Sequence, residues 1–297
     1  MTKRNRLSYF IPLFIALAIS ITGFIVGSIY DKNISQYFFD KNGIRVSPFS
    51  NIMCVVGPLL TNFFGAFAAT CVFFTCNRKS KTATILLKIL AVVTIIAISF
   101  LSWKTGSDFV SFVSNPTDAK KIGFRIMVAA IVVISDILVG YFTYKNIKKL
   151  DTKIVFWTGL TMLLIIIAVA GSNEVIKYLA SRPRPRLVFT SSEEFRAWYQ
   201  WRPLYGLKVS ESKSFISGHS SNSMSALTLL PLLVSLTSLS KKSNWLVVSV
   251  SIGALISLII GVSRLFALAH YLTDVCGGFI LSLVVQIVVL LLVDLIK

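Results

Sequence analysis

The chain has 297 residues, of which 55% are hydrophobic and 14% are charged, and its formal net charge is +18. Soluble domains carry about 25% charged residues and lack long apolar runs, so this composition excludes an ordinary soluble domain and indicates an integral membrane protein. The basic residues are divided among short loops, which favours membrane topology and an anionic substrate over nucleic acid as the reason for the charge.

About eight apolar runs are long enough for a bilayer, which needs about 20 residues per helix. In chain order they are Tyr9–Tyr30, Met53–Cys76, Ile85–Trp103, Phe124–Tyr144, Ile154–Ile176, Ser220–Leu239, Trp245–Val262 and Val275–Ile296. The predicted fold class is therefore all-α, a polytopic transmembrane helix bundle. The first run follows a basic start, but it continues for about twenty residues with no small-residue cleavage site, so we expect an uncleaved span.

Two kinds of polar group lie within these runs. The four cysteines occur without a CxxC pair, and we interpret them as packing residues rather than as disulfide or metal ligands; they are Cys54, Cys71, Cys76 and Cys276. Asp136 lies in the middle of VVISDILVG. An intramembrane carboxylate is either a functional group or a hydrogen-bonded structural residue facing the bundle, and no basic partner can be named from the sequence.

The loop charges predict the orientation. With a cytoplasmic N-terminus, the inner segments total thirty residues and hold thirteen Lys or Arg and one Asp, whereas the outer loops 31–50 and 104–123 hold six basic and four acidic residues. This positive-inside pattern places both termini in the cytoplasm. The outer segment 177–217 breaks it with eight basic residues, so either the orientation fails there or those cations have another role.

Three segments carry candidate chemistry, and the first is KYLASRPRPR, which begins at Lys177 and contains Arg184. Pro183 and Pro185 should present the cations on a stiff, non-helical stretch at the membrane surface. Arg has a planar fork of donors that suits phosphate, and Lys adds a point charge. Basic residues at the end of a span also commonly extend toward lipid headgroups, so this segment alone does not decide between the two.

The second segment, SFISGHSS, places Ser217, Gly218 and His219 before an apolar run. The first N–H groups of a helix lack internal partners and can bind an anion, and glycine allows a close approach to the backbone. Serine is either a hydroxyl donor or an N-cap. Histidine can transfer a proton near neutral pH. The alternative is a capped span with a histidine at the membrane interface.

The third segment, SRLFALAHYLTD, contains Arg264, His270 and Asp274. His270 and Asp274 are four residues apart, so on a helix they share a face. A carboxylate on one imidazole nitrogen leaves the other nitrogen free as a nucleophile. In the eight-span topology all three segments lie on the same outer face, and they include both histidines of the chain.

Together these segments resemble the type 2 phosphatidic acid phosphatase superfamily, whose pattern is Lys-x6-Arg-Pro, then Pro-Ser-Gly-His, then Ser-Arg-x5-His-x3-Asp. The first and third motifs match throughout, and the second has Ile216 where the family has proline. The resemblance covers residues 177 to 274. It divides the chain into N-terminal spans of unknown role, 1–150, and a phosphatase core, 151–297. Family members commonly have six spans, so two further N-terminal spans are a departure.

The resemblance implies a phosphatase with a phosphohistidine intermediate. His270 would be the nucleophile, Asp274 would orient it, and His219 would be the general acid and base. The phosphoryl oxygens would be held by Lys177, Arg184, Ser217, Gly218 and Arg264. Such a set of cations needs no metal or other cofactor, and the sequence shows no carboxylate and histidine cluster of metal-binding type. The implied partners are the bilayer and a phospholipid or prenyl phosphate substrate, at the extracytoplasmic face of the cytoplasmic membrane.

The segment 190–213 joins the first two motifs. It interleaves aromatic residues with cations: Trp198, Tyr199, Trp201 and Tyr205 with Arg196 and Arg202. Such residues settle at the membrane interface. We interpret the segment as a cap that admits a lipid headgroup from the side, or as a surface loop anchored by its aromatic residues.

Other functions remain open on the sequence alone. A lipid phosphotransferase, or a phosphatase for a soluble phosphate such as a sugar phosphate, would use the same site. A transporter is a different class, but transporters show paired broken spans in two halves, whereas the polar residues here gather at one face. A vanadium-dependent haloperoxidase shares the motifs, but those enzymes are mainly soluble. The sequence does not indicate an oligomeric state.

Overall fold

The computed structural model describes residues 3–42, 48–77, 80–108, 118–191, 193–202, 212–234, 236 and 243–296. Within these ranges the regular elements are all helices, which confirms the predicted fold class. They are α1 (Lys3–Asn42), α2 (Pro48–Thr75), α3 (Lys81–Asp108), α4 (Asp118–Ile147), α5 (Thr152–Ala180), α6 (Pro185–Thr190), α7 (Gly218–Leu227), α8 (Leu230–Val234), α9 (Ser243–Phe266) and α10 (Leu272–Ile296).

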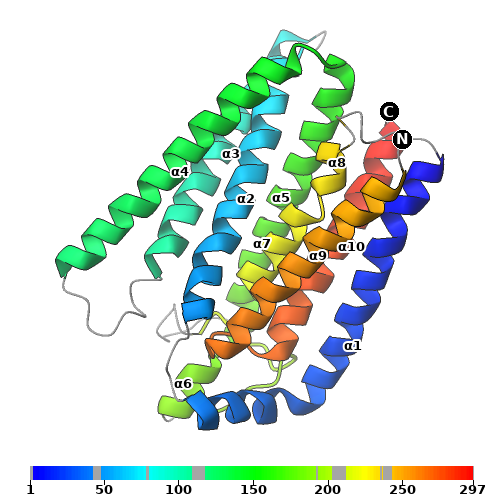
Figure 1. The fold of residues 1–297 in the computed structure, drawn as a ribbon. Coiled ribbons are helices and arrows are strands. Elements are labelled where there is room, and N and C mark those ends of the chain that lie inside the picture. Colours follow the sequence, from blue (N-terminus) through cyan, green and yellow to red (C-terminus); the bar gives the residue numbers. More distant parts are fainter. Residues whose placement is uncertain are drawn as a thin grey trace.

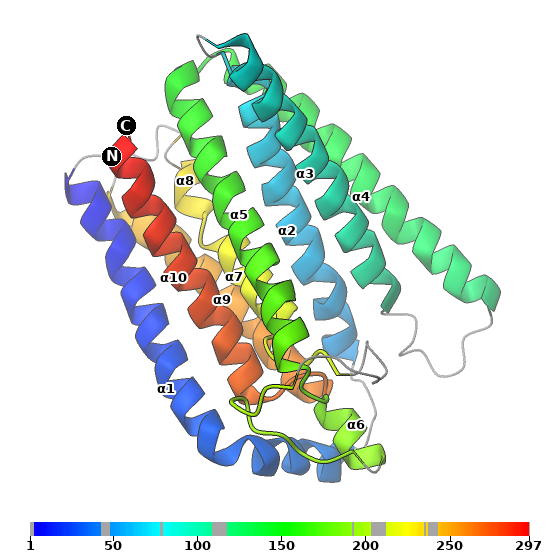
Figure 2. The same ribbon diagram turned by 180° about the vertical axis from the view of Figure 1, so that it is seen from behind.

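The long helices run side by side, and both termini lie at one end of the bundle (Figure 1). The short helix α6 and the connections into α7 and α10 lie at the other end (Figure 2). Among the described residues, seven helices are long and apolar enough to cross a membrane. The protein is therefore a multi-pass membrane protein.

The sixth predicted span is not a single helix. Within the described part of Ser220–Leu239 the chain forms α7, a turn at residues 228–229, and then α8. Pro231 has no N–H to donate to the carbonyl of Leu227, four residues earlier. That carbonyl lies against α9, where a Cβ added at Gly253 would be 2.2 Å from its oxygen. The α7–α8 pair nevertheless runs between the two ends of the bundle (Figure 1), beside the seven long helices.

The first helix is longer than the predicted span Tyr9–Tyr30. It continues to Asn42, so residues 31–42 of the predicted outer loop are helical. No glycine or proline interrupts this stretch. Its last part turns along the end of the bundle toward α6 (Figure 2), and α1 therefore reaches the end of the molecule where the motif residues lie.

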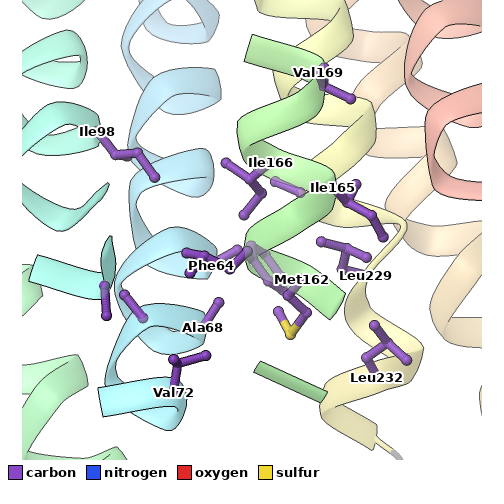
Figure 3. Close-up of a cluster of buried hydrophobic side chains, with 14 of the residues drawn as sticks. Phe64, Ala68, Val72, Ile98, Met162, Ile165, Ile166, Val169, Leu229 and Leu232 are labelled. Atoms are coloured by element: carbon purple, nitrogen blue, oxygen red, sulfur yellow. The ribbon is translucent and has the colours of Figure 1, made fainter. Parts of the chain in front are cut away.

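A buried apolar cluster joins α2, α5 and the α7–α8 pair, and Phe64, Met162 and Leu229 are among its members (Figure 3). In a bilayer, helices associate by close packing because lipid tails are as apolar as leucine. At Gly159 of α5 an added Cβ would lie 2.9 Å from the carbonyl oxygen of Ala68. The missing side chain therefore lets α5 approach the backbone of α2.

The helices α3 and α4 lie on one side of the bundle, away from α1 (Figure 1), and many of their large apolar side chains are exposed. Such faces suit contact with lipid tails. The four cysteines are free and buried, as expected of packing residues.

Candidate active site

The three motif segments meet at the end of the bundle opposite the termini. Lys177 lies in the last turn of α5, His219 in the first turn of α7 and Arg264 in the last turn of α9, while His270 lies in the turn before α10. The positive charges of Lys177 and Arg264 act on the His219 imidazole, which also interacts with His270, and the charges of Arg184 and Arg264 act on His270. The structure therefore brings both histidines and the three motif cations together.

The His270 imidazole is held by a backbone carbonyl. Its Nδ1 lies 2.7 Å from the oxygen of Ser214, whereas the nearest Asp274 oxygen is 3.8 Å from the same nitrogen. A carbonyl oxygen can only accept a hydrogen bond, so Nδ1 carries the proton and Nε2 keeps its lone pair. This geometry differs from the expected direct hydrogen bond to Asp274, and Ser214 was missed because a backbone acceptor leaves no mark on the sequence.

Asp274 reaches His270 through the chain around it. One carboxylate oxygen accepts hydrogen bonds from the Tyr271 N–H at 2.8 Å and from the Ser214 hydroxyl. The other oxygen accepts from Arg182 Nη1 at 2.7 Å. Ser214 therefore donates to Asp274 with its side chain and accepts from His270 with its backbone. Asp274 fixes both the turn that carries His270 and the acceptor that orients the ring.

His270 is buried, with 4% of its surface exposed. The pKa of His270 is lowered to about 4, mainly by burial and also by the positive charges of Arg184 and Arg264, while Asp274 opposes the shift. The ring is therefore neutral at neutral pH. A neutral imidazole with a free Nε2 lone pair is the form that can act as a nucleophile.

Lys177 lies against the start of α7. Its Nζ is 2.8 Å from a carboxylate oxygen of Glu174, and a Cβ added at Gly218 would be 2.8 Å from the same nitrogen. A side chain at Gly218 would therefore displace the lysine. Glu174 was not predicted, although its position three residues before Lys177 on one helix is a recognisable ion-pair spacing.

The two motif arginines, Arg184 and Arg264, lie in different surroundings. Ser181 ends α5 in a left-handed conformation, and Arg184 is extended, at φ −72° and ψ 151°. The expected non-helical stretch is short, because Pro185 begins α6. Arg264 is buried at 3% exposure, and its Nε has no hydrogen-bond partner within the described part of the chain. A buried guanidinium donor of this kind suits an anionic ligand.

The start of α7 is anchored from three sides. Ser217 is fully buried and caps the helix by accepting from Ser220 N–H, so of the two expected roles the structure shows the N-cap. His219 Nε2 lies 3.2 Å from the carbonyl oxygen of Cys54 in α2. Ile216 is buried among Phe215 and Ala180, so apolar packing holds the position where the family has proline.

Arg182 is a further buried cation that sequence analysis missed. Only 2% of its surface is exposed, and it pairs with Asp274 and with Asp31 of α1. Its guanidinium also lies 4.0 Å from the centre of the Tyr271 ring. The available signal was an arginine next to a proline in an apolar setting, but its partners could not be named from the sequence.

The described part of the predicted cap packs on the site end of the bundle. Trp198 Nε1 donates to Ser28 of α1 at 3.0 Å, and Phe195 packs edge-on against Tyr271 at 5.3 Å between ring centres. Tyr199 and Trp201 are exposed, as a membrane-interface position requires. Residues 192 and 203–211, including the predicted aromatic Tyr205, lie outside the described residues.

Comparisons with known proteins agree with the motifs. The family model described as PAP2 superfamily matches residues 158–296. Phosphatidylglycerophosphatase B of Bacillus subtilis (strain 168) is 33% identical over 130 residues, which cover 43% of this chain and 54% of that protein. The match thus spans about half the length of that relative. No solved structure gives a significant match.

Proposed function

Since residues 158–296 match the family model of the PAP2 superfamily, we propose that this chain is a membrane phosphatase that hydrolyses a lipid phosphomonoester or lipid pyrophosphate through a phosphohistidine. The observation that carries the proposal is the His270 imidazole, which is neutral, buried and oriented by Ser214, and which lies within the influence of Arg184 from the first motif and Arg264 from its own motif. The similarity to a phosphatidylglycerophosphatase supports a phospholipid substrate.

The first step is attack on phosphorus. His270 Nε2 forms a bond to phosphorus while the bond from phosphorus to the leaving oxygen breaks. His219 gives its proton to that oxygen, so the lipid leaves as an alcohol or a phosphate. His219 Nε2 faces the Cys54 carbonyl, which leaves Nδ1 as the atom that exchanges the proton.

The second step clears the phosphohistidine. His219, now neutral, takes a proton from a water molecule whose oxygen attacks phosphorus, and the bond to His270 Nε2 breaks. Inorganic phosphate leaves, and both histidines return to their starting forms. In the free protein, burial and the positive charge of Arg264 hold the pKa of His219 well below its ordinary value. The paired role near neutral pH therefore requires the bound phosphate to raise that pKa.

The cations supply the electrostatic part of the reaction. Lys177, Arg184 and Arg264 would hold the phosphoryl oxygens, with the backbone of Gly218 and the Ser217 cap shaping the start of α7. Phosphoryl transfer depends mainly on positioning and charge stabilisation, so such a set suffices. The bound dianion would also offset the positive charges around His219 and so favour its protonated form.

The site end of the bundle is proposed to face the extracytoplasmic side of the cytoplasmic membrane. The positive-inside pattern favours cytoplasmic termini, and the termini lie at the end opposite the site (Figure 1). Residues 151–297 would form the catalytic core. A substrate anchored in the bilayer would meet the site at headgroup depth, next to the exposed Tyr199 and Trp201.

The test is phosphate release by the purified protein from phosphatidate, phosphatidylglycerophosphate, a prenyl pyrophosphate, a lipid A-type phosphate and a sugar phosphate. We expect at least one lipid to be hydrolysed, with no effect of EDTA, and the His270→Ala variant to lose at least about 10³-fold in rate. Activity that survives this substitution would overturn the mechanism. Labelled phosphate that appears on an acceptor lipid instead of in solution would show a phosphotransferase.

A further inference from the structure

Asp31 of α1 lies in the buried centre of the site end, although α1 is outside the segment that matches the family. Its side chain is 3% exposed. One oxygen accepts from the Thr273 N–H at 3.0 Å, and the other accepts from Arg182 Nη2 at 3.0 Å and from the Thr273 hydroxyl. A buried carboxylate with this many donors is held in one position.

Two glycines bring α1 close enough for this contact. Gly23, Gly27 and Asp31 follow one another at intervals of four residues, so they lie on one face of the helix. A Cβ at Gly27 would be 2.9 Å from the backbone nitrogen of Thr273, and one at Gly23 would be 2.7 Å from Cys276 Sγ. This spacing of small residues is the pattern that lets two membrane helices pack backbone to backbone.

The contact falls on the first turn of α10, directly after His270. The N–H groups of a first turn lack partners within the helix, and carboxylates there are also favoured by the helix dipole. Asp274 accepts from the Tyr271 N–H, and Asp31 accepts from the Thr273 N–H two residues later. The backbone that leads from His270 into α10 is therefore fixed by one carboxylate from its own helix and one from α1.

Arg182 connects the two carboxylates. Its Nη1 donates to Asp274 at 2.7 Å and to the Thr273 hydroxyl at 2.8 Å, while its Nη2 donates to Asp31. The planar guanidinium sets the spacing of these groups, because its donors point in fixed directions. A change at Asp31 must therefore reach Asp274, and through Ser214 the His270 ring.

We infer that Asp31 is a positioning residue for His270, and that α1 belongs to the catalytic unit of this protein. The inference rests on the proposed function, since it gives Asp31 a part in orienting the nucleophile. Asp31 acts by holding the start of α10 and sharing Arg182 with Asp274. The phosphate cations Lys177, Arg184 and Arg264 are not among its hydrogen-bond partners.

The test is the Asp31→Asn variant, which keeps the size of the side chain and removes its charge. We expect kcat to fall about tenfold to a hundredfold, as a small misplacement of a reacting group does, while KM changes less than about twofold. Asp40→Asn is the matched control, because Asp40 is an exposed acid of the same helix. It should leave both constants unchanged.

Gly27→Ala tests the same contact without replacing a polar side chain, and it serves if Asp31→Asn does not fold. The added methyl group should push α1 away from Thr273 and lower kcat at nearly unchanged KM. Gly140→Ala on α4 is its control, because a Cβ there would meet nothing within 4 Å. The inference is overturned if Gly27→Ala, or a folded Asp31→Asn variant, keeps the wild-type kcat, or if the variants raise KM alone.

A binding assay separates this inference from the proposed function. Vanadate can bond to a nucleophile as the transition state does, whereas inorganic phosphate reports the cations alone, and both can be followed by protection against thermal unfolding. Asp31→Asn should weaken protection by vanadate at least about tenfold and leave that by phosphate unchanged. If the wild-type protein hydrolyses no member of the panel, the proposed function fails. If vanadate protects the wild-type and Asp31→Asn proteins equally, the role of Asp31 is overturned.

Discussion

Two groups of polar residues, one buried and one partly buried, hold carboxyl groups within the helix bundle, and they differ in their partners. At the site end, Asp31 and Asp274 share the guanidinium of Arg182. In the outer helices, Asp136 of α4 accepts from Asn62 Nδ2 and from Ser99 Oγ, each at 2.6 Å. The first group contains full charges in contact, whereas the partners of Asp136 are an amide and a hydroxyl.

This difference shows what an intramembrane carboxylate can mean. The stability of a cluster in which two carboxylates bind one arginine depends on all three residues, because the loss of one leaves an uncompensated buried charge. A carboxyl group with neutral donors depends on no single charge, and it joins α2, α3 and α4 as a hydrogen-bonded link. For Asp136 the structure thus shows the hydrogen-bonded arrangement, while Asp31 and Asp274 are connected by hydrogen bonds to the segment that carries His270, the proposed nucleophile.

The largest effect should follow from Arg182→Gln. The substitution leaves Asp31 and Asp274 close together without their shared cation, so we expect a loss of about 3–5 kcal/mol in stability and no measurable phosphate release. Thermal unfolding in detergent measures the first quantity. Arg182→Lys is a useful comparison, because it keeps the charge but loses the planar fork, and it should recover only part of the stability. An unchanged unfolding temperature for Arg182→Gln would show that the site-end group does not depend on its shared cation, and it would then not differ in this respect from the Asp136 group.

A smaller effect links the site group to pH. The ordinary pKa of histidine is 6.5, and in the folded protein that of His270 is about 4. Between these values the unfolded chain binds a proton that the folded site does not, so stability should fall as the pH is lowered from 6.5 toward 4. His270→Gln should reduce this dependence by up to about 1.4 kcal/mol per pH unit.

The measurement compares the unfolding temperatures of the wild-type and His270→Gln proteins at several pH values between 4.5 and 7. The two curves should approach each other as the pH falls, because only the wild-type protein loses the stability that depends on a neutral His270. Parallel curves would mean that the His270 pKa is ordinary. In that case burial would not explain why His270, the proposed nucleophile, is neutral.

The comparison also shows what could be predicted from the sequence. The motif residues Lys177, His219, Arg264 and His270 could be predicted because each belongs to a short segment with a recognisable spacing of residues. The predicted topology then placed these segments on one face of the membrane. The contact of Asp31 with Thr273 spans 242 positions. It depends on how α1 packs against α10, which the periodicity of a uniformly apolar helix does not specify.

Local structure limited the prediction in a second way. Hydropathy treats Ser220–Leu239 as one span, but Pro231 and the close approach of Gly253 divide it into α7 and α8. The Ser214 carbonyl that orients His270 was also beyond sequence analysis, because every residue has such an acceptor. Glycine spacing at Gly23 and Gly27 was the one signal in α1 that pointed to a close helix contact.

The smallest effect is expected at Asp136. Asp136→Asn keeps the shape of the side chain and loses at most one of the two hydrogen bonds, so stability should fall by about 1 kcal/mol and phosphate release should stay within about twofold of the wild-type rate. Asp274→Asn is the matched control, since the same substitution beside His270 should remove most activity. The hydrogen bonds of Asp136 to an amide and a hydroxyl do not connect α4 to His270, which is why we expect little effect on the rate. If Asp136→Asn lowered phosphate release as much as Asp274→Asn, that expectation would be wrong and the outer helices would contribute to the reaction.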